Sequence, residues 1–173
     1  MRGSRIDPPP RRRRPVVGDL TRRLQRVRLL AQWCETAPVA IAVELEDRWI
    51  VGLRDATVES TRSEEFRLVV AFAGGAELTI EGATTLGPTA RATERLDLWA
   101  NPSATTDSFS GLVGRKVLSA VAFKTVHLRI VFSPGLVLRV PADNHHEPWQ
   151  IVFPSGQLLV SQPGGGLSTW SGS

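Results

Sequence analysis

The sequence contains a single cysteine, no tyrosine, and no apolar run of the roughly 18–20 residues that a membrane-spanning helix needs. A lone thiol, Cys34, cannot form an internal disulfide, so the fold does not depend on an oxidising compartment. The N-terminal arginines are not followed by the apolar stretch of about 7–15 residues found in a cleaved signal peptide. These absences predict a cytoplasmic protein without a transmembrane segment.

Motifs that would commit the chain to a reaction are also missing. There is no phosphate-binding P-loop, no dinucleotide-binding glycine motif, no paired-histidine zinc motif and no nucleophile elbow. Cys34 has no partner at the spacing of a zinc site, so we expect no metal and no cofactor. Cys34 instead belongs to an apolar helical face, where it is expected to pack.

Basic charge is concentrated at the N-terminus. Residues 1–28 contain ten arginines and two acidic residues, a net charge of +8, whereas the remaining 145 residues contain 11 basic and 15 acidic residues, a net charge of −4. The body is therefore mildly acidic although the whole chain has a net charge of +4. An arginine-rich arm contacts phosphates without reading bases, which argues against a sequence-specific nucleic-acid protein.

Residues 1–18 combine three consecutive prolines with four consecutive arginines, which predicts a disordered basic arm. Residues 19–36 repeat apolar side chains at helical spacing, which predicts an amphipathic helix. Two interpretations remain open. The helix docks on the body through its apolar face, or the arm and helix make nonspecific contacts with nucleic acid or an anionic membrane. The candidate phosphate contacts are Arg11, Arg12, Arg13 and Arg14.

From residue 39 onward, apolar and polar residues alternate with the period of half-buried strands. The hairpin around Gly75 recurs 60 residues later around Gly135, which indicates an internal repeat between residues 39–83 and 111–173. Residues 84–110, rich in threonine, serine, alanine and proline, are expected to be the connector. The same shift pairs apolar lead-in residues: Leu53 with Val113, and Val58 with Leu118.

The β domain is predicted to span residues 37–173. Its many short strands favour an all-β fold, with two similar strand units packed as a sandwich or partly closed barrel and preceded by one N-terminal helix. Val43 and Leu45 are expected on the buried face of the first strand. Four aromatic side chains are expected in the core: Phe72, Phe132, Trp149 and Trp170.

The segment Asp143–Glu147 is the most concentrated polar group in the chain. Its candidate binding residues are Asp143, His145, His146 and Glu147, whose side chains can bind a divalent ion or transfer protons. Adjacent residues of a strand point to opposite faces, so the two imidazoles share a site only if the segment turns. The alternative interpretation is a solvated loop that leads into the next strand.

The C-terminal part of the chain carries its most distinctive residues. These are the element Glu147-Pro148-Trp149, the run Gly111-Leu112-Val113-Gly114 at the start of the second unit, and the closing Pro163-Gly164-Gly165-Gly166-Leu167-Ser168-Thr169-Trp170. Together they resemble an uncharacterised family of small bacterial two-repeat β proteins with a Glu-x-Trp element and a closing Pro-Gly-Gly-x-Leu-x-x-Trp motif. The resemblance covers roughly residues 40–173. It implies a protective role, such as that of an immunity protein beside a secreted toxin, and it carries over no catalytic residue.

Two functions agree with these observations. The favoured one is a non-enzymatic module that binds an unidentified protein partner, in its finer form an immunity-like inhibitor whose acidic body pairs with a basic toxin. The alternative is a small-ligand-binding domain or an enzyme with a site near Asp143–Glu147. The candidate contacts of the favoured module are Asp143, Glu147, Glu59, Glu64 and Glu65.

Overall fold

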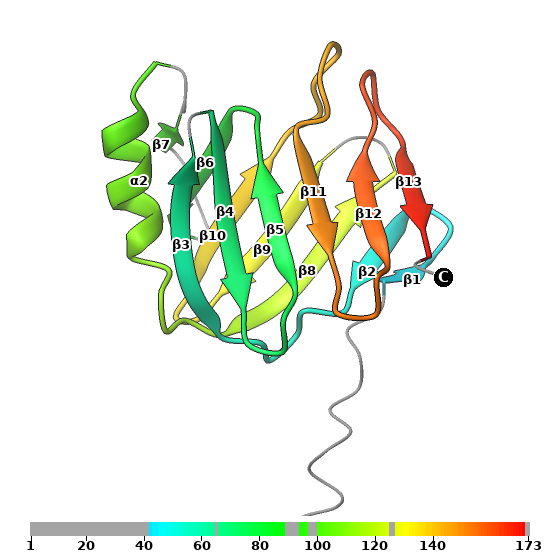
Figure 1. Cartoon of the computed structure of the whole chain (residues 1–173), viewed down its shortest axis with the longest axis horizontal. Coiled ribbons are helices and arrows are strands. Elements are labelled where there is room, and N and C mark those ends of the chain that lie inside the picture. Colours follow the sequence, from blue (N-terminus) through cyan, green and yellow to red (C-terminus); the bar gives the residue numbers. More distant parts are fainter. Residues whose placement is uncertain (1–41, 65, 89–93, 97–99, 125–126, 172–173) are drawn as a thin grey trace, which may run out of the picture. The chain divides into compact units, whose positions relative to one another are not determined.

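The computed structural model describes residues 42–64, 66–88, 94–96, 100–124 and 127–171 of the 173-residue chain (Figure 1). The chain divides into two units, Met1–Ala37 and Pro38–Ser173, and every described residue belongs to the second. The expected arm and helix therefore lie outside the described residues. The same holds for Cys34, Glu65 and the candidate phosphate contacts Arg11 to Arg14.

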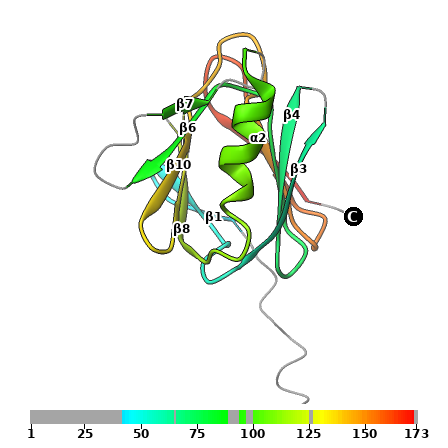
Figure 2. The ribbon, with the colours of Figure 1, turned by 90° about the vertical axis from the view of Figure 1, so that its left-hand side faces the viewer.

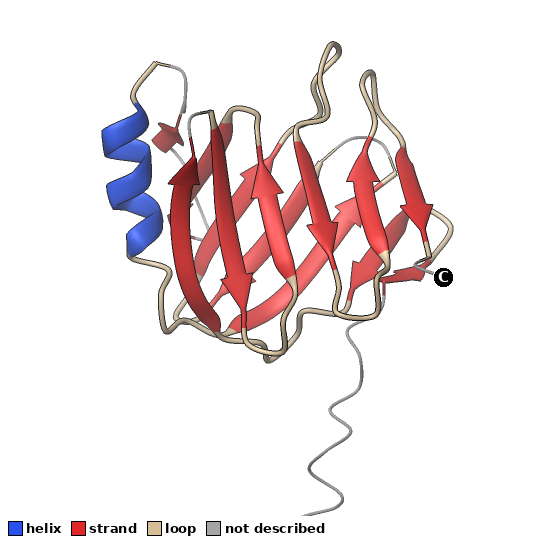
Figure 3. Cartoon of the chain, viewed as in Figure 1, coloured by secondary structure: helices blue, strands red, loops and turns tan. Residues whose placement is uncertain are grey.

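The second unit is a sandwich of two antiparallel sheets (Figures 1 and 3). The seven-stranded sheet contains, from edge to edge, β1 (Ala42–Glu44), β2 (Arg48–Val51), β8 (Val117–Phe123), β9 (Leu128–Phe132), β10 (Leu136–Val140), β6 (Thr84–Pro88) and β7 (Glu94–Leu96). The six-stranded sheet contains β13 (Leu167–Trp170), β12 (Leu158–Ser161), β11 (Trp149–Val152), β5 (Glu77–Ile80), β4 (Arg67–Phe72) and β3 (Val58–Glu64). Neither order closes on itself, so the all-β prediction is confirmed in its sandwich form.

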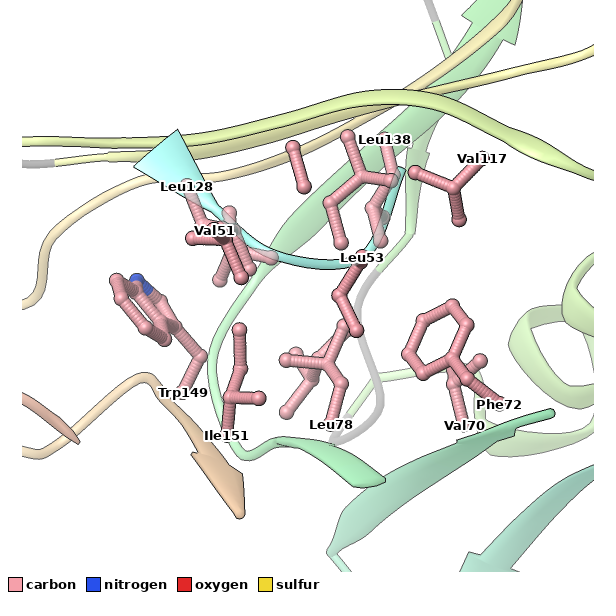
Figure 4. Packing of buried hydrophobic residues seen from close by; sticks show 14 of the residues in the cluster. Val51, Leu53, Val70, Phe72, Leu78, Val117, Leu128, Leu138, Trp149 and Ile151 are labelled. Atoms are coloured by element: carbon pink, nitrogen blue, oxygen red, sulfur yellow. The ribbon is translucent and has the colours of Figure 1, made fainter. Parts of the chain in front are cut away.

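A continuous apolar core fills the space between the sheets (Figure 4). Phe72, Phe132 and Trp149 are among the largest fully buried side chains, which confirms three of the four predicted aromatic positions. The prediction for Trp170 is wrong, because this side chain is 49% exposed. Leu167 of the same strand packs against the core, and alternation along the strand turns Trp170 to the outer face.

The first strand is shifted by one residue relative to the prediction. Ala42 is buried, whereas Val43 and Leu45 are exposed. Val43 lies opposite Ile50, so both side chains are on the outer face of the seven-stranded sheet. A shift of one residue exchanges the two faces of a strand, and a three-residue strand offers few positions to fix the pattern.

Residues 84–110, expected as a connector, contain β6, β7 and the helix α2 (Pro102–Ser110). The Thr84 hydroxyl of β6 donates to the Arg139 carbonyl of β10 at 2.8 Å. A threonine-rich composition suits strands as well as loops, which is why composition alone did not find β6. The helix α2 covers one end of the sandwich beside β3 (Figure 2) and buries Thr105 and Phe109. Within the described ranges, no helix has the length and apolar character needed to cross a membrane.

The strands β3-β4-β5 and β8-β9-β10 form two similar meanders, one in each sheet. The segments that lead into them hydrogen-bond to each other reciprocally. The Val58 amide donates to the Arg115 carbonyl at 3.0 Å, and the Val117 amide donates to the Ala56 carbonyl at 2.9 Å. Each bond is related to the other by an offset of 59 residues, so the two lead-ins meet about an approximate two-fold axis.

The same offset corrects the predicted pairing of the lead-in residues. Leu112 and Val117 are buried and occupy the places of Leu53 and Val58. The residues expected there, Val113 and Leu118, are exposed. The offset becomes 60 from β4 and β9 onward, because the connection between β8 and β9 is one residue longer than that between β3 and β4.

Candidate functional site

The segment Asp143–Glu147 is part of the connection between β10 and β11, and it supports its own turn. The Asp143 Oδ1 atom accepts the amide N–H groups of His145 at 2.7 Å and of His146 at 3.1 Å. The Asp143 carbonyl accepts the Gly164 amide N–H at 2.8 Å, which ties this connection to the β12–β13 turn. Asp143 therefore uses both its carboxylate and its carbonyl to hold local backbone.

The two imidazoles of this segment are exposed and do not converge on one point. Their ring centroids lie 6.3 Å apart in an edge-on arrangement. The backbone N–H of His145 is the main cause that lowers the pKa of the Asp143 carboxyl. Over the residues that the structure describes, no group of three His, Cys, Asp or Glu side chains is placed to hold a metal ion.

Of the predicted acidic contacts, Glu59 and Glu64 lie on the six-stranded sheet, and Glu147 lies in the loop before β11. Glu59 is near the start of β3, and Glu64 is at its end, opposite Arg67 of β4. Arg67 pairs with Glu81 at 3.7 Å, and Glu81 and Glu147 line a pocket of about 100 Å³. The structure thus gathers Glu64, Glu81 and Glu147 at one end of the sheet and leaves Glu59 apart. The pocket is smaller than the roughly 300–1,000 Å³ of small-molecule sites.

A row of apolar side chains crosses the outer face of the six-stranded sheet. Val152 lies opposite Leu158, and Leu158 lies opposite Trp170. Val152 and Trp170 are 43% and 49% exposed, and Leu158 is half-buried. We call these three residues the apolar stripe. The sequence could have indicated this stripe, because Leu167 and Trp170 are three residues apart in one short strand and therefore point to opposite faces.

A second unpredicted feature lies on the outer face of the seven-stranded sheet. Arg129 of β9 lies directly opposite Arg139 of β10, and we call these residues the arginine pair. The sequence could have indicated this pairing, because both arginines are five residues from Pro134 in the turn and residues at equal distances from a hairpin turn lie opposite each other. The other arginines with described side chains have an acidic or carbonyl partner: Arg48, Arg54, Arg62, Arg67 and Arg115. The arginine pair has neither among the residues that the structure describes.

An aromatic ring and an imidazole accompany the arginine pair. The Phe123 ring stacks on the His127 ring with centroids 4.4 Å apart. The guanidinium carbons of Arg48 and Arg129 lie 5.4 and 5.6 Å from the Phe123 ring centroid. Burial, followed by the charges of Arg129 and Arg139, lowers the pKa of His127. The lowered pKa favours the neutral imidazole, which has one hydrogen-bond donor and one acceptor.

Comparison with known proteins identifies a family without assigning a function. No curated protein and no solved structure matches the chain. The model of DUF6188, a family of unknown function, matches residues 49–171. This range extends from β2 to the end of β13 and therefore includes the apolar stripe, the arginine pair and the Asp143–Glu147 segment.

Proposed function

The chain belongs to the DUF6188 family, whose function is unknown, and we propose that it is a non-enzymatic protein-binding module. Its partner binds the outer face of the six-stranded sheet at the apolar stripe. The observation that carries this proposal is the exposed Trp170 in one row with Val152 and Leu158. Aromatic side chains are enriched at the centre of protein interfaces, where they supply much of the binding energy.

The position of the stripe supports this proposal. β13, which carries Trp170, is the edge strand of its sheet (Figure 1). A partner can therefore contact the stripe from the face and also hydrogen-bond to the backbone of β13, which is an edge strand among the described strands. The opposite edge strand of the same sheet, β3, is contacted by α2.

Charge indicates what kind of partner the stripe would accept. Two arginines lie on this sheet, Arg62 and Arg67, and both form ion pairs with acidic residues of the same surface. The strands of this sheet and the loops next to them carry five acidic residues, three more than the number of arginines: Glu59, Glu64, Glu77, Glu81 and Glu147. Such a surface attracts a basic partner and accelerates association at low salt. On this ground the finer proposal is a bacterial, cytoplasmic, immunity-like inhibitor of a basic toxin.

The proposal is tested by affinity capture from the native host with the full chain as bait, at low and at high salt. Trp170→Ser removes the centre of the stripe, and Val113→Ser is the matched control because Val113 is also half-exposed but lies in the α2–β8 loop. We expect one stoichiometric protein to be retained by the wild type and by Val113→Ser. The same protein should be lost with Trp170→Ser and released by salt.

Two outcomes contradict this proposal. Equal retention of a partner by the wild type and by Trp170→Ser would place the interface elsewhere on the chain. Capture of no protein, together with an unchanged monomer mass by light scattering for both proteins, would remove the stripe as a protein-binding surface. A dimer that Trp170→Ser dissociates would identify a second copy of this chain as the occupant.

A further inference from the structure

The arginine pair has two features that the folded chain by itself does not account for. Like charges that lie directly opposite in an antiparallel sheet destabilise it. In addition, the Nε atom of Arg129 is buried and has no hydrogen-bond partner, which is uncommon for a charged donor. An anion bound from outside would neutralise the like charges of the pair.

The arginine pair is held in a defined position. The Arg129 guanidinium lies over the Phe123 ring. The Phe123 ring is in turn stacked on the His127 ring. A cation–π contact orients the guanidinium plane without consuming its N–H groups. In the part of the chain that the structure describes, no acceptor bonds to these N–H groups; because Nε is buried, the terminal Nη groups are the ones available to a ligand.

Arg139 also lines a pocket of about 350 Å³, together with Thr85, His127, Pro141 and Ala142. A neighbouring pocket of about 240 Å³ shares Thr85 and Pro141 with it. The larger of the two volumes lies at the lower end of the range for small-molecule sites, roughly 300–1,000 Å³. The wall of this pocket is almost entirely apolar, with Pro141 and Ala142 among its lining residues, and Arg139, Thr85 and His127 place a guanidinium, a hydroxyl and an imidazole next to it.

We propose that this face binds a small organic oxyanion, with its phosphate or carboxylate group on Arg129 and Arg139 and its apolar part against Pro141 and Ala142. Thr85, directly opposite Arg139, and His127 supply further hydrogen bonds. This site lies on the seven-stranded sheet and is independent of the apolar stripe, which lies on the six-stranded sheet. The proposal therefore goes beyond protein binding and does not rest on it.

The test is a titration of the full chain with inorganic phosphate and, separately, with succinate, at an ionic strength held constant with sodium chloride. The readouts are the NMR signals of the His127 ring and the thermal unfolding midpoint. The double variant Arg129→Gln/Arg139→Gln removes the pair, and Arg67→Gln is the matched control on the other sheet. The N-terminal arginines are unchanged in all three proteins, so any binding to them cancels in the comparison.

We expect saturable shifts of the His127 signals in the wild type and in Arg67→Gln. The apparent affinity of the double variant should fall roughly tenfold or more, because it loses hydrogen bonds from two charged donors. A response to phosphate alone identifies a phosphate ligand, and a response to succinate alone identifies a carboxylate ligand. Without anion, the double variant should unfold at the same or a higher temperature than the wild type, because neutralisation removes like-charge repulsion.

Three results would overturn this proposal. The first is an equal response of the wild type and the double variant, which would place anion binding elsewhere, for example on the basic N-terminal residues. The second is a response of the wild type to neither anion beyond that to chloride. A lower unfolding midpoint of the double variant without anion would assign the pair a structural role instead.

Discussion

Trp149 and Trp170 are the same type of residue in opposite environments. Trp149 is buried between the sheets at 1% exposure, whereas Trp170 is 49% exposed on the outer face. We therefore expect Trp149→Ala to lower the free energy of unfolding by about 3–5 kcal/mol and Trp170→Ala by less than about 1 kcal/mol. Urea denaturation of the two variants measures both values. A large loss for Trp170→Ala would mean that the stripe is structural rather than a binding surface.

His127 gives the unfolding free energy a defined pH dependence. Burial, and then Arg129 and Arg139, lower its pKa in the folded protein below the reference value of 6.5. Near pH 6.5 the unfolded chain therefore binds a proton at His127 that the folded chain does not. The contribution of His127 to the free energy of unfolding is complete above that pH and is lost as the pH falls below it.

The prediction is a decrease of the urea midpoint from about pH 7 to pH 5.5 that His127→Gln reduces. His145→Gln serves as the control, because the His145 ring is exposed and its ring contact is with His146. The comparison requires a series of urea midpoints for the three proteins. Parallel pH profiles for the wild type and His127→Gln would show that the surroundings of His127 do not affect stability.

At the scale of elements, the two lead-in segments form equivalent turns with different residues. Asp55 and Gly114, related by the offset of 59, both have a positive φ, of 65° and 80°. Aspartate and asparagine tolerate this conformation better than alanine does. We expect Gly114→Ala to cost about 1–2 kcal/mol of unfolding free energy, and Gly114→Asn to cost less.

Denaturant unfolding of these variants provides the measurement. No atom lies within 4 Å of a Cβ added at Gly114, so a loss there reports backbone strain and not a clash. The matched control is Gly111→Ala, because Gly111 has φ −66° at the end of α2 and is already in a right-handed conformation. Equal losses for Gly114→Ala and Gly114→Asn would contradict the equivalence of the two turns.

At the scale of the whole molecule, charge is distributed unevenly along the chain and between the two sheets. The outer face of the six-stranded sheet has an excess of acids, the outer face of the seven-stranded sheet carries the arginine pair, and residues 1–28 have a net charge of +8. We expect deletion of residues 1–18 to abolish salt-sensitive binding to a DNA duplex or to anionic vesicles and to leave the thermal unfolding midpoint unchanged. Fluorescence anisotropy and vesicle co-sedimentation over a salt series measure the binding. Unchanged binding after the deletion would move the contact to the β sandwich.

The strands and hairpins of this protein were predictable because they depend on local patterns. Alternating apolar residues and turn glycines such as Gly75 and Gly135 determine where strands occur and where they reverse. The positions of Phe72, Phe132 and Trp149 in the core followed from the same alternation. The role of the Asp143–Glu147 segment was not predictable in this way. Its polar residues stand out in the sequence, but the Asp143 carboxylate accepts backbone N–H groups of its own turn.

The sequence by itself determined the all-β class, the main hairpins and most of the core, because these follow from the two-residue period of strand burial. Only the tertiary structure decided which sheet each meander joins, that β6 adds to β10, and that Trp170 faces outward. It also decided that Arg129 and Arg139 have no acidic partner among the described residues. The physical reason is that pairing between strands and the choice of face depend on residues far apart in the chain, which no local period encodes.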